Sequence, residues 1–220
     1  MSSRPDLKLA YCDHPTAVDA CRRWHFTGTA PKGKYVRYGI WEDGKFCGVV
    51  MFGSGATPQI GKNHGLDQIT CCEMVRLALG PHATPTSRIL GIAIRLLRKH
   101  SPGIRLIITF CDPDAGHYGG IYQATGWSYV GEQKTRVHLR IRGRLWHWRT
   151  VESKYKTHSL KWLRENIDPS ADWVGWQRRW KYVLPLDDEI KQRITSILLP
   201  YPKKVDVIGR DVHDDCAQQA

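Results

Sequence analysis

Residues 112–122 combine a carboxylate, an imidazole and a phenol within a glycine-rich run. Asp112 directly follows the apolar, strand-like run Leu106–Cys111. Because open α/β sheets gather their ligands beyond the carboxyl ends of the strands, Asp112 is placed to accept a proton from a bound substrate. His117 follows on a turn after Gly116 and could act as a base or as a metal ligand. Asp112 could equally be a turn residue that precedes a proline.

Three more candidates lie at the ends of predicted helices. The loop 82–87 leads into a helix predicted over Thr86–His100, and a helix N-terminus can bind an anion through its free amides. Ser87 and Arg88 could add a hydroxyl and a positive charge to such a site, while helix capping is the commoner role of a serine there. His25 ends the first predicted helix, and on sequence alone it is only a helix-terminus histidine.

The seven cysteines are odd in number and unevenly spaced, and none forms a C-x-x-C pair. Several fall within apolar runs, where a free thiol behaves as a small hydrophobic side chain. This pattern predicts reduced thiols and no structural zinc site. The spacing of the histidine, aspartate and tyrosine residues does not indicate a metal either, so the metal content is left open.

The pattern of apolar runs, turns and helix ends predicts an α/β fold with a mixed sheet. Asp43-Gly44 lies between two β-rich runs and predicts a type I′ hairpin, because that turn needs positive φ at both central residues. Strands are predicted at 7–11, 36–41, 46–52, 69–79, 106–111 and 128–130, and helices at 15–23, 86–100 and 121–124. This order resembles that of the acetyltransferase superfamily, and residues 107–130 resemble its strand–helix–strand ending.

Positive charge and tryptophan are concentrated in one quarter of the chain. Of the formal net charge of +12, residues 133–183 contribute +9, from 13 Lys and Arg against 4 Asp and Glu. The same stretch holds six of the nine tryptophans. Cations that neutralise phosphates, beside rings that stack on bases, indicate a nucleic-acid surface. The alternative is a small Trp-rich core surrounded by solvated lysines and arginines.

Within this basic stretch, alternating residues predict a face that contacts DNA. If residues 140–148 form a β-ribbon, the even-numbered positions share one side. Arginines on that side could contact phosphates while tryptophans stack on an extruded base or wedge the gap that it leaves. The residues expected to contact DNA are Arg140, Arg142, Arg144, Trp146, Trp148 and Arg149.

Several longer runs resemble the Mom family of phage DNA-modification proteins. The most specific run is Asp112–Ala124, and the others are Lys34–Glu42, Gly65–Gln68, Cys72–Leu79, Thr84–Leu90 and Leu199–Lys204. The resemblance implies a phage enzyme that converts adenine in duplex DNA to an N6-carbamoylmethyl-type adduct, which hides phage DNA from host restriction. Because the N6 amine lies within the base stack, base flipping is expected as well.

The same resemblance implies roles for individual residues. His25 matches a position that the family assigns to catalysis, and Tyr122 falls where acetyltransferase-like enzymes place a tyrosine that protonates the leaving group. Iron is suggested for the family, although no ligand spacing supports it in this sequence. The acetyltransferase pyrophosphate loop carries glycines that residues 82–87 lack. We therefore expect an activated acyl or aminoacyl donor, and weak or absent binding of acetyl-CoA.

Three segments are expected: an acetyltransferase-like catalytic domain over 1–132, a basic, Trp-rich C-terminal extension over 133–204 and a disordered tail over 205–220. No apolar stretch approaches the ~20 residues that a membrane span needs. No signal-peptide core is evident, so we expect a cytoplasmic protein of the infected bacterium without a membrane partner. The oligomeric state is left open.

Two other functions fit parts of the sequence. An acyltransferase of the same superfamily, acting on tRNA, a peptide or a small amine, would bind acyl-CoA strongly and would not respond to DNA. A non-catalytic DNA-binding shield would bind duplexes in a salt-dependent way without producing a new nucleoside. The basic, Trp-rich stretch disfavours the first, and the polar turn at 112–122 disfavours the second.

Overall fold

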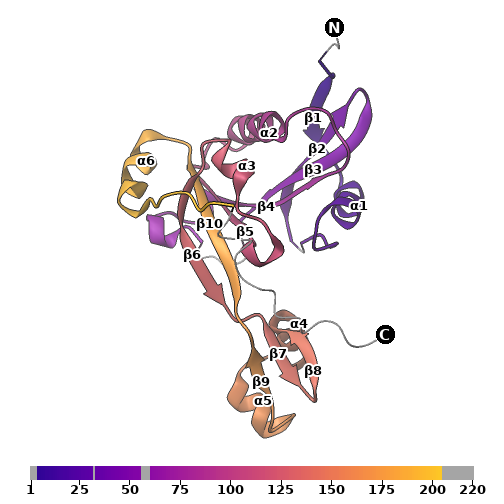
Figure 1. The fold of residues 1–220 in the computed structure, drawn as a ribbon, viewed down its shortest axis with the longest axis vertical. Helices are drawn as coiled ribbons and strands as arrows, with labels where there is room; N and C mark the ends of the chain where they lie inside the picture. Colours follow the sequence, from indigo (N-terminus) through magenta and orange to yellow (C-terminus); the bar gives the residue numbers. More distant parts are fainter. Residues whose placement is uncertain (1–3, 32, 56–59, 205–220) are drawn as a thin grey trace. The chain divides into compact units, whose positions relative to one another are not determined.

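The protein is described by a computed structural model that covers residues 4–31, 33–55 and 60–204 (Figure 1). The chain forms two compact units. Of the described residues, unit 1 contains 4–31, 33–55, 60–111, 119–131 and 181–203, and unit 2 contains 112–118, 132–180 and Lys204. The segment Lys181–Lys203 lies within the extension expected over 133–204, and its contacts place it in unit 1. The expected tail, residues 205–220, lies outside the described residues.

A seven-stranded mixed sheet, in the order β1-β2-β3-β4-β5-β10-β6, organises unit 1. Strands β1 to β4 are antiparallel neighbours, whereas β4 and β5 run parallel. The strands are β1 (Leu7–Tyr11), β2 (Tyr35–Glu42), β3 (Lys45–Gly53), β4 (Cys71–Leu79), β5 (Leu106–Cys111), β6 (Ser128–Thr135) and β10 (Gln177–Pro185), of which β6 and β10 run on into unit 2. The predicted mixed α/β fold is confirmed, but β10 was not predicted.

The β2–β3 hairpin and the first helix form as their residues predict. Asp43 has φ 49° and Gly44 has φ 76°, the backbone values that a type I′ turn requires. Asp13 caps α1 (His14–Trp24) by accepting a hydrogen bond from the Thr16 amide at 2.8 Å. The buried face of α1 packs on β3 and β4 through Ala17, Ala20, Cys21, Val49, Met51 and Ala78.

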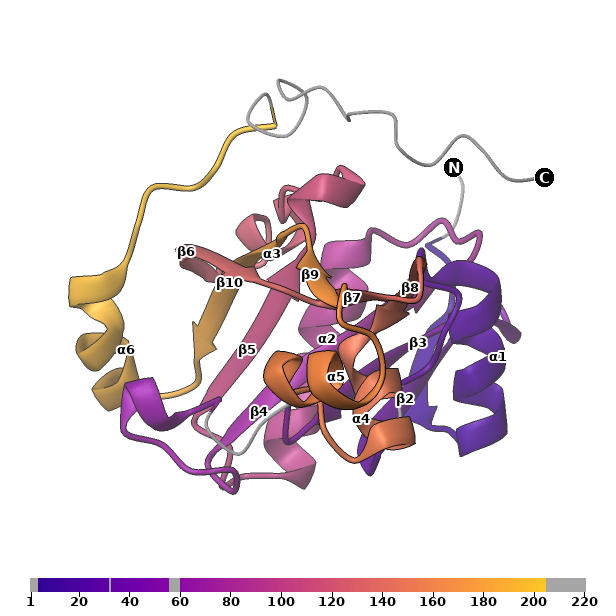
Figure 2. The same cartoon turned by 90° about the horizontal axis from the view of Figure 1, so that it is seen from below.

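Helices cover both faces of the unit 1 sheet. On β3, Val49 and Met51 face α1. The next residue, Phe52, lies on the other face of the sheet, near Leu97 of α2 (Thr86–His100). Figure 2 shows α1 beside β3 and α6 (Asp188–Ile194) at the opposite end of the sheet. There α6 buries Ile190 and Ile194 against the other core cluster, which contains Leu66, Cys71, Leu106, Ile108 and Val183.

Unit 2 contains a small antiparallel sheet in the order β8-β7-β9. Its strands are β7 (His138–Ile141), β8 (Arg144–His147) and β9 (Asp172–Val174), and its helices are α4 (Trp148–Tyr155) and α5 (Leu160–Asn166). A core between the helices and one sheet face contains Leu139, Ile141, Val151, Leu163 and Ala171, with Trp146, Trp148 and Trp173 packed against it. The other sheet face carries no helix from this core.

Residues 138–147 form a hairpin of β7 and β8, and its turn overturns the prediction that the even-numbered positions of 140–148 share one side. Arg142 and Gly143 form a turn with positive φ, and Trp148 is the first residue of α4. Because Arg140 pairs with Leu145 whereas Arg144 pairs with Ile141, the Arg140 and Arg144 side chains leave the sheet on opposite faces. The Arg142 guanidinium donates to the Ile167 carbonyl oxygen at 3.3 Å. The named residues therefore share no common face, although their contact with DNA stays a prediction.

Candidate functional site

The two central parallel strands of unit 1 separate halfway along their length. The paired register runs from Cys71 with Leu106 to Glu73 with Ile108. Beyond it, the Thr109 hydroxyl donates to the Met74 carbonyl oxygen at 3.0 Å, so a side chain takes the place of a ladder bond. The separation creates a point in the sheet where a side chain can reach backbone groups of both strands.

Tyr122, from the short helix α3 (Gly120–Gln123), points its hydroxyl at this separation. The phenol oxygen lies 3.4 Å from the Thr109 hydroxyl, and the ring centroid lies 5.5 Å from Trp127 and 5.3 Å from Tyr182. Burial raises the pKa of Tyr122 to about 12, against the opposing hydrogen bond with Thr109. The phenol therefore stays protonated at neutral pH, which suits a proton donor and not a base.

Contacts within unit 1 hold Tyr122 in place. A Cβ on Gly119 would lie 2.4 Å from the Tyr182 ring, so only glycine fits before the helix. The Gln123 amide donates to the Tyr182 hydroxyl at 3.1 Å and to the Pro202 carbonyl oxygen at 3.2 Å. The Tyr201 hydroxyl donates to the Trp127 carbonyl oxygen at 2.7 Å. Tyr201 and Pro202, near the C-terminus, therefore bond to residues that pack around Tyr122.

Asp112 lies in unit 2, at the start of a 3₁₀ turn over Pro113–Ala115. Its Oδ1 accepts from the Asp114 amide at 3.0 Å and from the Ala115 amide at 3.2 Å. Its Oδ2 accepts from the Gln177 side-chain amide at 2.9 Å. The Oδ1 bonds within the turn are in keeping with the alternative of a turn residue, while Oδ2 bonds to the first residue of β10.

The same turn carries His117, and its remaining polar groups tie it to β10. The His117 amide donates to the Asp112 carbonyl oxygen at 3.0 Å, and the residue is exposed. Asp114 pairs with Arg178 at 2.8 Å, and the same arginine lies 3.5 Å from Glu132. The structure therefore brings Asp112 and His117 together in one turn of unit 2, as their sequence spacing predicted.

The loop before α2 is organised by a residue that the sequence did not single out. The two Glu42 carboxylate oxygens accept from the Ala83 and Thr84 amides, each at 2.7 Å. The Thr84 hydroxyl and these amides lower the pKa of Glu42, which keeps it anionic. An internal carboxylate therefore occupies two backbone amides of the loop that leads into α2. Only its place at the end of β2 distinguishes Glu42 in the sequence.

Ser87 and Arg88 begin α2 behind that loop. Pro85 occupies the N-cap position of the helix and no side chain makes a cap bond there, so Ser87 does not have the capping role given as its alternative. Ser87 is half-buried and Arg88 is exposed. His25 ends α1, where its Nδ1 lies 2.8 Å from the Thr27 hydroxyl and its ring packs at 4.6 Å on Phe26.

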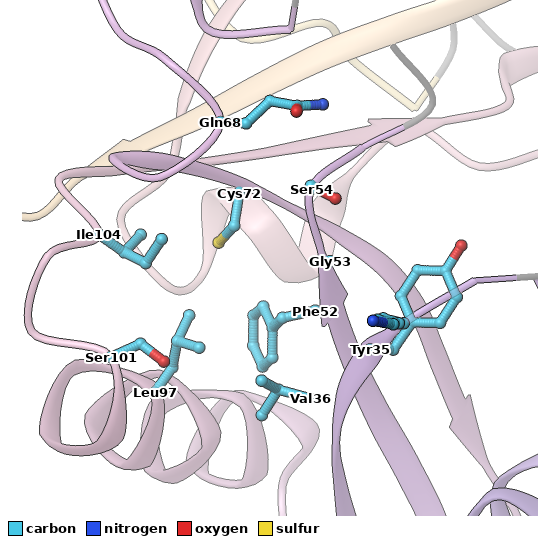
Figure 3. A pocket seen from close by; sticks show the side chains of 11 residues that line it. Tyr35, Val36, Phe52, Gly53, Ser54, Gln68, Cys72, Leu97, Ser101 and Ile104 are labelled. Atoms are coloured by element: carbon cyan, nitrogen blue, oxygen red, sulfur yellow. The ribbon is translucent and has the colours of Figure 1, made fainter. Parts of the chain in front are cut away.

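A cavity of about 370 Å³ opens at the other end of α2 (Figure 3). Its lining includes exposed polar side chains, Lys34, Ser54 and Gln68, and it has an apolar wall formed by Val36, Phe52, Cys72, Leu97 and Ile104. Burial raises the pKa of the Cys72 thiol, so the wall carries no charge there. The cavity could hold the apolar part of a small ligand, with its polar end near the exposed side chains.

A buried pair of basic residues was also missed from the sequence. The Lys181 Nζ lies 3.0 Å from the His64 Nε2, and both residues are buried. Burial and the nearby lysine lower the pKa of His64 to about 4, so its ring is neutral and accepts the hydrogen bond. Burial likewise lowers the pKa of Lys181. Lys181 follows two arginines in a charged run, which concealed the strand that contains it.

Comparison with known proteins places the chain among its relatives. A model of the Mom protein family matches residues 6–203. The chain belongs to the Mom protein family. The methylcarbamoylase mom of Escherichia phage Mu is 22% identical over 187 residues, which cover 81% of this Mom-family chain and 76% of that protein.

A solved structure supports the fold of this Mom-family chain. A protein of Acinetobacter baylyi assigned as an acetyltransferase superposes with a TM-score of 0.50 at 12% identity, covering 85% of this chain and 96% of that one. The acetyltransferase-like fold is therefore confirmed. Over residues 4–31, 33–55 and 60–204, no cluster of three or more His, Cys, Asp or Glu is arranged to hold a metal. No described helix combines the length and apolarity needed to cross a membrane.

Proposed function

We propose that this chain is a transferase that modifies adenine in DNA, attaching a carbamoylmethyl-type group to N6 and so protecting phage DNA from restriction. The family match over residues 6–203 carries the proposal. The relative from phage Mu, a methylcarbamoylase, supports the type of group transferred. The acetyltransferase-like fold fits a reaction in which an amine takes up a group from an activated donor.

Tyr122 is the residue that we assign to proton donation. Its phenol remains protonated because burial raises its pKa to about 12, and its hydroxyl lies at the separation of β4 and β5. A donor at this position stabilises the group that leaves as the N6 bond forms. Asp112 is proposed as the acceptor of the N6 proton, and His117 and His25 as supporting residues, on the sequence pattern alone.

The donor is proposed to be an activated acyl or aminoacyl group other than acetyl-CoA. Acyl transfer breaks the bond between the carbonyl carbon and its carrier and joins that carbon to N6, so a glycyl donor gives an N6-glycyl adduct, which must then rearrange to its carbamoylmethyl isomer with the methylene on N6. Glu42 holds the Ala83 and Thr84 amides at 2.7 Å, so a pyrophosphate at this loop would meet a carboxylate instead of free donors. Ser87 and Arg88 remain as the contacts for a smaller anion. Calorimetry tests this directly, because micromolar binding of acetyl-CoA would return the chain to the ordinary acyltransferases.

Nucleoside mass spectrometry tests the main proposal. DNA from bacteria that express the protein should contain an adenine derivative heavier than N6-methyladenine. DNA from cells that express Tyr122→Phe at equal level is the matched control and should contain far less. Standard nucleosides only, in the presence of abundant folded wild-type protein, would rule out the modification. Salt-dependent DNA binding in that case would leave a shield against restriction enzymes.

A further inference from the structure

The sheet of unit 2 has one covered face and one open face. Residues opposite one another on antiparallel strands share a face, and His138 pairs with both His147 and Val174. Arg140 likewise pairs with Leu145 and Asp172. These residues alternate with the buried Leu139 and Ile141, so they lie opposite the core. The register places His138, Arg140, Leu145, His147, Asp172 and Val174 on this face. We define the open face by these residues together with Arg136 and Trp176, which contact each other beyond the strand ends.

Trp176 is the most exposed tryptophan of unit 2. It is 58% exposed and follows Gly175, whose φ of 64° separates β9 from β10. The Arg136 guanidinium lies 4.6 Å from its ring centroid, an arrangement that holds both side chains on the surface. Trp146 and Trp173, in contrast, pack against the core. Burial within unit 2 explains the core tryptophans but not the exposed ring of Trp176, which contacts Arg136.

The open face is positively charged. Within the described part of the chain, no ion pair involves Arg136 or Arg140. Asp172, which lies opposite Arg140, already has an Arg164 nitrogen at 3.3 Å. Burial lowers the pKa of His147, and its Nδ1 accepts from the Arg149 amide at 3.2 Å as the cap of α4. Its ring lies 5.8 Å from that of His138.

We propose that this open face binds unpaired DNA. Trp176 stacks on an unpaired base, and Arg136 and Arg140 contact the flanking phosphates. Stacking on an aromatic ring accepts any base, and cations that alternate with rings follow a single strand. The choice of DNA over RNA rests on the proposed function. The position of His138, Arg140, Leu145 and His147 rests on the strand register, and that of Arg136 and Trp176 on their contact with each other beyond the ends of the paired strands. The face differs from the expected set, which included two tryptophans of the core.

Fluorescence anisotropy of the full chain tests the stacking role. The probes are a duplex with one unpaired adenine, the fully paired duplex and an RNA of the same sequence. Trp176→Ala should weaken binding to the unpaired probe about tenfold or more, and binding to the paired duplex less. Trp176→Phe keeps a ring and should retain most of the affinity. The matched control is Trp162→Ala, an exposed tryptophan on α5, the helix that covers the opposite face.

Salt titrations of the same complexes test the two arginines. Arg136→Ala and Arg140→Ala should each make the slope of log K against log salt shallower by roughly 0.7 to 0.9, because each removes one phosphate contact. Lys161→Ala, an exposed lysine on α5, is the charge-matched control and should leave the slope unchanged. Far-UV circular dichroism confirms that each variant is folded.

Three results would overturn the inference. Equal losses for Trp176→Ala and Trp162→Ala would show that the face has no special role. Stronger binding of the RNA than of either DNA would assign the face to RNA. Self-association in the ultracentrifuge that Trp176→Ala abolishes, with DNA binding intact, would assign it to a second copy of the chain. Mass spectrometry of DNA modified by the wild type tests the proposed function separately from this inference. If adenine is modified but Trp176→Ala leaves DNA binding unchanged, only this inference is contradicted.

Discussion

The two sheets differ in how many of their faces are covered. In unit 1, α1 and α6 pack on one side and α2 on the other, and even polar side chains such as Thr109 and Lys181 are buried with hydrogen-bond partners. In unit 2, helices cover one side only, and the other presents cations and a tryptophan. The same residue types therefore serve packing on one face and, in our proposal, contact with DNA on the other. Residue type alone does not separate these roles, whereas strand register does.

Tyr122, the proposed proton donor, lies in unit 1, and the proposed DNA-binding face lies in unit 2. Asp112 also lies in unit 2, so a large effect of Asp112→Asn on the reaction would show that unit 2 takes part in the chemistry as well. If Asp112 accepts the N6 proton, modification should fall by two or more orders of magnitude, the scale of general-base catalysis. Mass spectrometry of DNA measures the loss, and Asp114→Asn in the same turn is the control. Near-normal modification would leave Asp112 as the cap of its turn, bonded to Gln177.

Tyr122→Phe should sharpen the assignment of chemistry to unit 1. The ring contacts with Trp127 and Tyr182 remain, so the fold is retained, while the loss of the proton donor lowers the rate by about a hundredfold. Because the pKa of the phenol is about 12, deprotonation of Tyr122 should not lower the wild-type activity up to about pH 10. A rate within twofold of wild type would remove Tyr122 from the mechanism.

A pair of leucines on neighbouring strands compares the two faces of the unit 2 sheet. Leu139 is fully buried in the core, so Leu139→Ala should lower the free energy of unfolding by about 2 to 5 kcal/mol. Leu145 is 59% exposed, so Leu145→Ala should change it by less than about 0.5 kcal/mol. Urea unfolding followed by tryptophan fluorescence measures both. A large cost for Leu145→Ala would show that the open face is packed in solution.

The His64–Lys181 pair makes the stability of unit 1 depend on pH. Because the pKa of His64 falls from 6.5 to about 4 on folding, the unfolded chain binds its proton first as the pH drops. Stability is therefore full above pH 6.5 and falls between pH 6.5 and about 4, by up to about 3 kcal/mol. His64→Gln should flatten this part of the curve of unfolding free energy against pH. An equally steep fall in the variant would assign the dependence to other groups.

Local signals in the sequence predicted most of the sheet. The Asp43-Gly44 turn, the apolar periodicity of α2 and the apolar run of β5 each depend on neighbouring residues, and all three formed as expected. Strand β10 was missed because its first residues are mostly charged, with a tryptophan between them, and do not show the apolar pattern of a buried strand. Its pairing depends on strands far away in the sequence, and its lysine is buried through contact with His64.

The parts of the candidate site that are formed by residues close together in the sequence could be predicted. The spacing of Asp112 and His117 predicted one turn, and the structure has that turn. Glu42 and the Ala83 amide meet across 41 positions, which no short pattern reveals. The separation of core tryptophans from Trp176 likewise requires the register of β7 with its two neighbours.

The position of β10 has a consequence for the synthesis of the chain. Strand β10 lies between β5 and β6, yet it leaves the ribosome after both of them and after nearly all of unit 2. Until then, β5 has an unpaired edge, the kind of surface that pairs with other chains. Closing so long a loop also slows the last step of folding. A chain cut after residue 132 should therefore aggregate instead of forming an independent catalytic unit.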